Sequence, residues 1–312
     1  QTDESEKNSP VPLKMAVSGY DAYSIMIPLR IAEVKDFFAE EGIDIEIITT
    51  GGGGDTVRAV TTGGLDAAIA GADATISAIM AGEAITIVAP YIQTTDNAWV
   101  VPENSPIQSV EDLEGKTMGF TSPGSSTEFM AKAFIRATGI QAIPLRTGGD
   151  GDTWAAVKSG NVDAAWSIEP LTSLKVLNEN ARVIFWAHDY LPHYMMDTLS
   201  VHNDYLNQHP ETIRGLLRAI QKGMDFLAEN VDEAAQIGAE HLKVSEEVVK
   251  NSIANLPNKE VGLSLKVDPL AFKTIEEGMI EAGKITEPIR DWNQVFDQSY
   301  LDPDWRAEIP VN

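Results

Sequence analysis

The chain has 312 residues, no cysteine, and 23 Lys+Arg against 47 Asp+Glu, which gives a formal net charge of −24. The lack of cysteine excludes disulfides, thiolate catalysis, iron–sulfur clusters and thiolate zinc sites, and the negative charge disfavours nucleic acid as a partner. No apolar run approaches the ~20 residues that a membrane-spanning helix needs, and the length is typical of about two domains.

Residues 1–12 are polar, charged and interrupted by proline, and they contain no apolar segment of a signal peptide. This composition predicts a disordered tether. Two origins stay open. The tether can belong to a mature exported protein, periplasmic or extracellular and lipid-anchored through a leader that has been removed, or it is the plain terminus of a cytosolic protein.

From residue 13 the chain alternates between short apolar strands and amphipathic helices. Strands are expected at 13–17, 43–48 and 85–91, with helices at 26–40 and 75–81 between them. This alternation predicts a largely parallel sheet with helices on both faces. In such sheets ligands bind beyond the carboxyl ends of the strands.

One segment of this pattern occurs twice. Residues 54–69 match residues 151–166 without a gap, and nine positions are identical. Each copy predicts a helix capped by Asp55 or Asp152, a glycine stop and a small-residue strand. The repeat therefore predicts two lobes of like design.

The second lobe is expected to contain strands at 117–120, 142–145 and 183–186. Beyond a strand at 199–202 the chain reads as helical, at 210–230, 231–242, 245–255 and 268–282, with no second set of strands. These helices are expected to pack back on the first lobe. The predicted domains are a discontinuous first lobe of residues 13–97 and 199–312, and a second lobe of residues 98–198.

The Ser/Thr-rich turn before the helix that follows residue 125 is the sharpest local signal of a site. Free amides at a helix start carry partial positive charge, and hydroxyl groups beside them add donors, so the turn suits a sulfonate, carboxylate or phosphate. It can equally be an ordinary helix cap. Its polar residues are Ser122, Ser125, Ser126 and Thr127.

Further candidates fall at predicted loops on the ligand side. Gly52 lies in a four-glycine loop where backbone can approach a ligand, and Gln93 lies in a predicted crossing. Aromatic side chains can enclose an apolar or planar ligand, and carboxylates can receive an ammonium or a ring N–H. The aromatic residues are Tyr20, Tyr23, Trp154 and Trp166, and the acidic residues are Asp73, Glu169 and Asp197.

The sequence contains no sign of a cofactor, metal site or catalytic centre. The five histidines lack the helical spacing of metal ligands. Neither a G-x-S-x-G elbow nor an assignable Ser/His/Asp order is present. We therefore expect binding without turnover.

Several motifs together carry a family resemblance. They are Gly19-Tyr20 and the segments 37–46, 64–68, 110–116 and 162–170. With these, the chain resembles the periplasmic solute-binding proteins of ABC importers, in the branch that handles sulfonates, taurine, nitrate and thiamine-pyrimidine precursors.

The resemblance implies a type II-like fold of two α/β lobes that close on a ligand and deliver it to a membrane permease. It implies a monomer, with hinges at 93–98 and 197–199, and ligand loops at Tyr20, Asp73, Ser125, Ser126 and Glu169. The first expectation for the ligand is a sulfonate or similar organic anion. The alternatives are a pyrimidine or other nitrogen heterocycle, or an enzyme of the same fold that makes a cofactor precursor.

Overall fold

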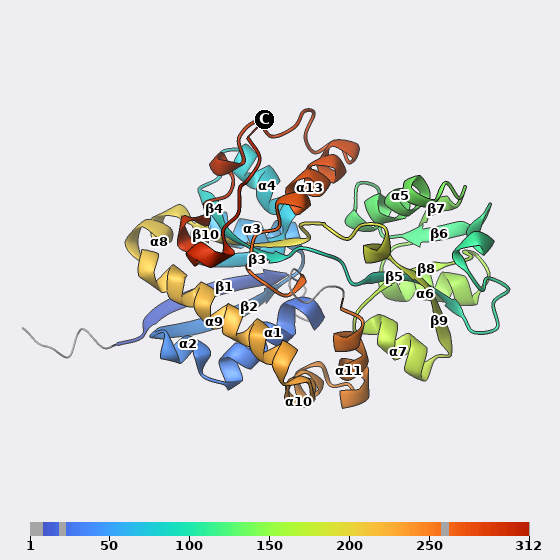
Figure 1. Ribbon diagram of the computed structural model, residues 1–312, viewed down its shortest axis with the longest axis horizontal. Helices are drawn as coiled ribbons and strands as arrows, with labels where there is room; N and C mark the ends of the chain where they lie inside the picture. Colours follow the sequence, from blue (N-terminus) through green and yellow to red (C-terminus); the bar gives the residue numbers. More distant parts are fainter. Residues whose placement is uncertain (1–8, 19–22, 257–261, 312) are drawn as a thin grey trace, which may run out of the picture.

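The computed structural model of the chain describes residues 9–18, 23–256 and 262–311, and only the backbone of 23–25. Tyr20 and the side chain of Tyr23 therefore lie outside the described part. Within it, the strands gather in two lobes that lie side by side and are joined by extended crossings (Figure 1). None of the described helices is long and apolar enough to cross a membrane.

The first lobe is built on a five-stranded sheet with the order β2-β1-β3-β10-β4. β1 runs parallel to β2 and β3, whereas β10 runs antiparallel to β3 and β4. Because β1 starts at Val11, the last two residues of the predicted tether belong to a strand. The strands are β1 (Val11–Ser18), β2 (Ile43–Thr50), β3 (Ala67–Gly71), β4 (Ile85–Ile92) and β10 (Asp197–His202).

The second lobe repeats this order. Its strands pair as β8-β5-β9 and β6-β7, and a parallel bridge between Met118 and Ala164 joins the two groups. The resulting order β7-β6-β8-β5-β9 mirrors the first lobe, with β5 as the antiparallel strand. The predicted two-lobed α/β fold is thus confirmed. The strands are β5 (Asn97–Pro102), β6 (Thr117–Phe120), β7 (Ile143–Arg146), β8 (Ala165–Ile168) and β9 (Ala181–Trp186).

The two copies of the repeat occupy equivalent places. They form α3 (Gly53–Thr61) with β3, and α6 (Asp150–Lys158) with β8. In each lobe the aspartate before the strand accepts a backbone amide of the neighbouring strand at 2.8 Å: Asp66 from Lys14, and Asp163 from Thr117. The expected helix caps need correction, because glycines 52 and 149 hold the N-cap positions and the two aspartates lie in the first turn.

Helices cover both sheets. Most of the buried apolar residues belong to one cluster that runs through both lobes, and each lobe has a smaller separate cluster. In the second lobe, Trp99 stacks on Phe185 at 5.1 Å between ring centroids, and Phe185 on Phe134 at 4.1 Å. The other helices up to residue 208 are α1 (Tyr23–Val34), α2 (Phe37–Glu40), α4 (Ala72–Met80), α5 (Ser126–Thr138), α7 (Leu171–Asn178) and α8 (Asn203–Gln208). Short 3-10 helices are η2 (Val110–Leu113), η3 (Ala187–Asp189), η4 (Trp292–Gln294), η5 (Gln298–Tyr300) and η6 (Pro303–Trp305).

The C-terminal helices contact both lobes. α9 and α10 pack against α1. In contrast, α11 also packs against α7, and α13 lies between α4 and α5 (Figure 1). Of the four C-terminal helices that the structure describes, two therefore contact both lobes. These helices are α9 (Pro210–Glu229), α10 (Val231–Leu242), α11 (Glu246–Ala254) and α13 (Pro269–Glu281).

Candidate functional site

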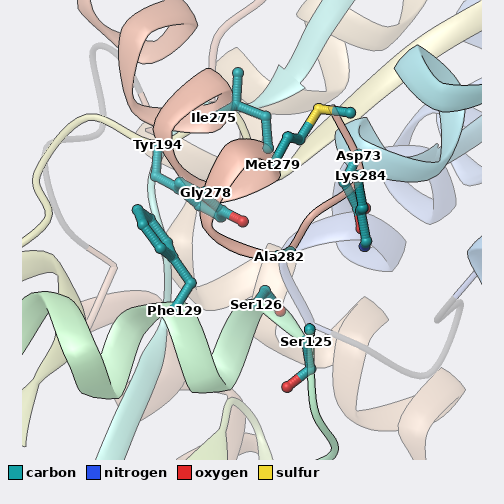
Figure 2. A pocket seen from close by; sticks show the side chains of 11 residues that line it. Asp73, Ser125, Ser126, Phe129, Tyr194, Ile275, Gly278, Met279, Ala282 and Lys284 are labelled. Atoms are coloured by element: carbon teal, nitrogen blue, oxygen red, sulfur yellow. The ribbon is translucent and has the colours of Figure 1, made fainter. Parts of the chain in front are cut away.

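A pocket lies where the two lobes and α13 meet. Figure 2 shows α5 of the second lobe on one side and the start of α4 from the first lobe on another, with α13 above them. The cavity between them has a volume of only about 10 Å³, which is room for about one water molecule and far below the ~300–1,000 Å³ of sites for drug-sized ligands. The pocket is lined by Asp73, Gly124, Ser125, Ser126, Phe129, Tyr194, Ile275, Gly278, Met279, Ala282 and Lys284.

The start of α5 supplies one wall of this pocket. The Ser125 hydroxyl caps the helix by accepting the Glu128 amide at 3.3 Å, and the Thr127 hydroxyl lies 3.0 Å from it. The carbonyl of Ser122 accepts the Ser125 amide at 3.0 Å, which closes the turn. Among the described residues, nothing accepts the amides of Ser126 and Thr127. The helix therefore presents free donors and partial positive charge at the pocket.

An ion pair lies at the opposite wall. Asp73, in the first turn of α4, contacts the ammonium of Lys284, which follows α13. The two side chains are 35% and 34% exposed, so neither is sequestered from solvent. Figure 2 shows them next to each other, across the pocket from Phe129. A ligand that enters here meets both charges.

Two buried polar groups lie beside this ion pair. Burial, and secondarily the charge of Asp73, raises the pKa of the Asp197 carboxyl to about 7. Burial, followed by the charges of Asp73 and Asp197, also raises the pKa of the Tyr194 phenol, which therefore stays protonated. Neither side chain makes a hydrogen bond to another described residue. Figure 2 shows the Tyr194 hydroxyl directed toward the centre of the pocket.

Three predicted site residues have their polar groups engaged elsewhere. The Gln93 side chain donates to the carbonyl of Lys266 at 2.6 Å and accepts the amide of Asp268 at 2.7 Å, so it anchors the chain before α13. The Trp166 indole donates to the carbonyl of Gly148 at 3.1 Å. Gly52 is the N-cap of α3, and its carbonyl accepts the amide of Thr56 at 2.9 Å.

Glu169 is fully buried and joins the lobes. Its carboxylate accepts the amide and hydroxyl of Ser173 at 3.2 and 3.0 Å, within the second lobe. It also accepts the Ser252 hydroxyl and the Asn255 amide group, both at 2.8 Å and both from the α11 segment. A carboxylate has about four acceptor positions. All four are filled, so Glu169 has no position left for a ligand in this conformation.

Some of the predicted site residues thus line the pocket, together with residues that the sequence did not indicate. Asp73, Ser125 and Ser126 meet there, and Asp197 lies within electrostatic reach. Tyr194, Lys284 and the α13 residues were not expected. Lys284 follows a predicted helix stop and contacts a residue 211 positions away, so no local pattern marks it.

One further predicted site residue falls outside this pocket. Trp154 is buried in the outer core of the second lobe, where its indole donates to Glu179 at 2.7 Å. Across the described part of the chain, no three His, Asp or Glu side chains are grouped as metal ligands.

Comparison with known proteins places the chain among binding proteins. A family model described as NMT1/THI5 like matches residues 24–234, more than half of the chain. An aliphatic sulfonates-binding protein of Bacillus subtilis is 27% identical over 73% of this chain and 70% of its own length. The riboflavin-binding protein RibY of Chloroflexus aurantiacus is 25% identical over 88% and 82%. The formylaminopyrimidine-binding protein of Halalkalibacterium halodurans is 26% identical over 67% and 64%.

Two other similarities bear on fold and on catalysis. The crystal structure of the periplasmic aliphatic sulphonate binding protein SsuA from Escherichia coli superimposes with a TM-score of 0.75, at 19% identity over 97% of each chain. A 4-amino-5-hydroxymethyl-2-methylpyrimidine phosphate synthase of Legionella pneumophila is 21% identical over 67% of both chains. The similarities therefore include an enzyme beside the binding proteins.

Proposed function

This chain belongs to the NMT1/THI5-like family, and we propose that it is the solute-binding component of an ABC import system. It captures one small organic ligand between its lobes and delivers it to a permease in the membrane. The fold shared with a periplasmic sulphonate binding protein and the names of three sequence relatives support this function. Two lobes joined by extended crossings can close on a ligand by hinge motion.

The start of α5 is the observation that carries the ligand assignment. Its free amides face a pocket that also contains the Lys284 ammonium. Amides at a helix start and a nearby cation together favour an anionic or strongly accepting group. The ligand is therefore a sulfonate or a similar organic anion, bound with its acidic oxygens at Ser125 and Ser126.

A nitrogen heterocycle is the second candidate. Asp73 and Asp197 lie within electrostatic reach of each other and offer acceptors for ring N–H or amino groups. The similarity to a formylaminopyrimidine-binding protein favours the same class. A pyrimidine would bind with its N–H groups toward these carboxylates and its acceptor atoms toward α5.

The third possibility, an enzyme of the same fold, makes a different prediction. The polar groups at the pocket act as a helix cap and an ion pair, so we propose that the ligand leaves unchanged. Incubation of protein with its ligand, followed by mass spectrometry, returns an intact ligand if the protein only binds it. A chemically altered product contradicts the binding function.

Native mass spectrometry of the purified protein tests the proposal directly. The expected result is a protein species carrying one small organic molecule, which is released and identified after denaturation. The bound form is also expected to be more compact in solution scattering than the ligand-free form. A protein that carries no solute and does not change shape with any candidate ligand contradicts the proposal.

Location and partners belong to the same proposal. We place the protein in the periplasm or at the cell exterior, as a monomer tethered by its polar first residues to a lipid anchor. The net charge of −24 disfavours nucleic acid. Membrane fractionation of the natural producer, before and after removal of bound lipid, tests the anchor.

A further inference from the structure

We propose that a second pocket, on the first lobe, binds a small polyanion that carries phosphate or carboxylate groups. The pocket lies between α9 and the C-terminal segment, and its volume is about 310 Å³, within the ~300–1,000 Å³ range of small-molecule sites. Figure 1 shows the C-terminal segment, in red, beside α9 in the first lobe, with the second lobe on the opposite side of the molecule. The inference concerns a site outside the pocket between the lobes and does not depend on the proposed function. Its charged and aromatic lining residues are Arg214, Arg218, Arg306, Asp302, Tyr300 and Trp305.

Arginine is concentrated at this pocket. Three of the nine arginines of the chain line it, although the chain as a whole has a net charge of −24. Arg214 and Arg218 lie four positions apart on α9, so they project from the same face of the helix. Arg306 joins them from the C-terminal segment. A guanidinium group presents its N–H donors in a planar fork that matches the oxygens of phosphate and carboxylate groups.

Two of the guanidinium groups converge on a single neutral oxygen. The Ser299 carbonyl accepts Nη1 of Arg214 at 2.6 Å and Nη2 of Arg306 at 3.0 Å. The Leu301 carbonyl accepts Nε and Nη2 of Arg306 at 3.1 and 2.8 Å. Neutral carbonyls thus hold the two cations close together, and like charges at short distance repel each other. An anion bound between them would offset this repulsion.

The nearby carboxylates leave some of the arginine donors unused. Glu211 lies 3.4 Å from Arg214, but it is 84% exposed, and such pairs contribute little. Arg218 donates to Glu41 through Nε and Nη2 only, and Arg306 forms no ion pair with a described residue. Within the described part of the chain, one terminal nitrogen of each guanidinium therefore has no partner: Nη2 of Arg214, and Nη1 of Arg218 and of Arg306.

The other polar groups of the pocket supply two more donors and one opposing charge. The Tyr300 hydroxyl and the Trp305 indole N–H make no hydrogen bond to a described residue, and both can donate. Among the described residues, Asp302 is the only carboxylate that lines the pocket. One of its oxygens accepts the amide of Asp304 at 3.0 Å. Because its charge repels an anion, its removal should strengthen binding.

Titration with pyrophosphate and with citrate tests the inference. Nuclear magnetic resonance follows the indole N–H signal of Trp305, which is identified by its loss in Trp305→Phe. We expect at least one probe to shift this signal with a dissociation constant of about 1 mM or lower, and the binding to weaken as sodium chloride is added. Comparison of the two probes distinguishes a phosphate site from a carboxylate site. No shift with either probe at about 10 mM overturns the inference.

Two variants with opposite expected effects assign the binding to this pocket. Arg306→Gln should weaken probe binding about tenfold, because it removes a cation that has no carboxylate partner. Asp302→Asn should strengthen probe binding about threefold or more, since it removes the opposing charge and keeps an oxygen for the Asp304 amide. The second variant retains the helix cap, so the test remains decisive even if Arg306→Gln does not fold.

Arg290→Gln and Asp291→Asn are the matched controls. Arg290 is 81% exposed and pairs with Glu287, and Asp291 caps η4 in the way that Asp302 caps η6. Neither control residue lines the pocket, so both variants should keep the wild-type affinity within about twofold. Equal changes in the pocket variants and the controls, or weaker binding by Asp302→Asn, contradict the inference.

Discussion

Because Asp197 is buried, the protonation of its carboxyl makes the stability of the folded chain depend on pH. Its pKa is about 7 in the folded chain, above the ordinary value of 3.8. Between these values the folded state binds the proton more tightly than the unfolded state. The contribution of Asp197 to the free energy of unfolding therefore falls as the pH rises from about 4 to 7, and the full penalty is present above 7.

Asp197→Asn should remove this pH dependence. The free energy of unfolding of the variant, relative to wild type, is expected to rise between pH 4 and 7, by at most about 4 kcal/mol for a shift of roughly three pKa units. Urea unfolding at several pH values measures the difference. Asp44→Asn, at an exposed position of β2, is the control and should give a flat difference. A flat difference for Asp197→Asn would mean that its pKa is ordinary.

The two serines at the start of α5 should behave differently from each other. Ser125 caps the helix, whereas the Ser126 hydroxyl has no acceptor or donor among the described residues. Ser125→Ala should lower the free energy of unfolding by about 1 kcal/mol, and Ser126→Ala by less than ~0.5 kcal/mol. Both should weaken ligand binding by ~1 kcal/mol for each hydrogen bond lost. Unfolding and calorimetric titrations of the two variants check this, and equal stability losses would contradict it.

For single residues, the sequence predicts features that depend on neighbours in the chain, but it does not predict contacts between residues that are far apart in the chain. The corner at Ser125 is predictable because a cap and its helix are adjacent in the chain. The Lys284 contact with Asp73 is not, because it depends on how α13 lies against α4. Glu169 directly follows β8, but its partners Ser252 and Asn255 come from the α11 segment, whose position the sequence leaves open.

At the scale of elements, the positions of the strands and of most helices follow from the hydrophobic periodicity of the sequence and from the glycine and proline residues that end each element. The repeat predicted two like lobes, and the structure gives them the same strand order. α7 was not expected, since it is short and directly follows a strand that ends in Glu169-Pro170. The sequence also leaves open which lobe each C-terminal helix contacts, because an apolar face does not specify its partner.

The packing of α9 on α1 depends on one glycine. A β-carbon at Gly223 would lie 2.3 Å from the carbonyl oxygen of Pro28, a backbone atom that cannot move aside by itself. Gly223→Ala should therefore lower the free energy of unfolding by about 1–3 kcal/mol or more. Gly151→Ala on α6 meets no atom within 4 Å and is the control; it should be neutral or stabilising by ~0.5–1 kcal/mol. Calorimetric melting compares them, and a neutral Gly223→Ala would contradict this packing.

At the scale of the whole molecule, contacts across the lobes favour the closed arrangement. Glu169 reaches α11 on one side, and Glu281 of α13 contacts Lys132 and Arg136 of α5 on another. The surface pairs around Glu281 contribute little individually. The buried carboxylate matters more, because hydrogen bonds to a charged group are worth about 1.5–3 kcal/mol.

Breaking the Glu169 contacts should open the protein without touching the pocket. Asn255→Ala is expected to increase the radius of gyration of the ligand-free protein and to weaken ligand binding about tenfold, as expected for a loss of ~1.4 kcal/mol. Asn251→Ala, on the same helix, is the control. In a double-mutant cycle, Glu169→Ala should add little to Asn255→Ala plus Ser252→Ala. Unchanged scattering and affinity would show that these contacts do not hold the lobes together.

The positions of β5 and β10 bear on how the chain folds while it is being made. The sheet of the second lobe uses strands from residues 97–186 only, so it can be completed as soon as that stretch has left the ribosome. The first sheet cannot, because β10 lies between β3 and β4 and is synthesised about a hundred residues after them. The sheet of the first lobe therefore stays incomplete, without a strand between β3 and β4, until after the second lobe has folded.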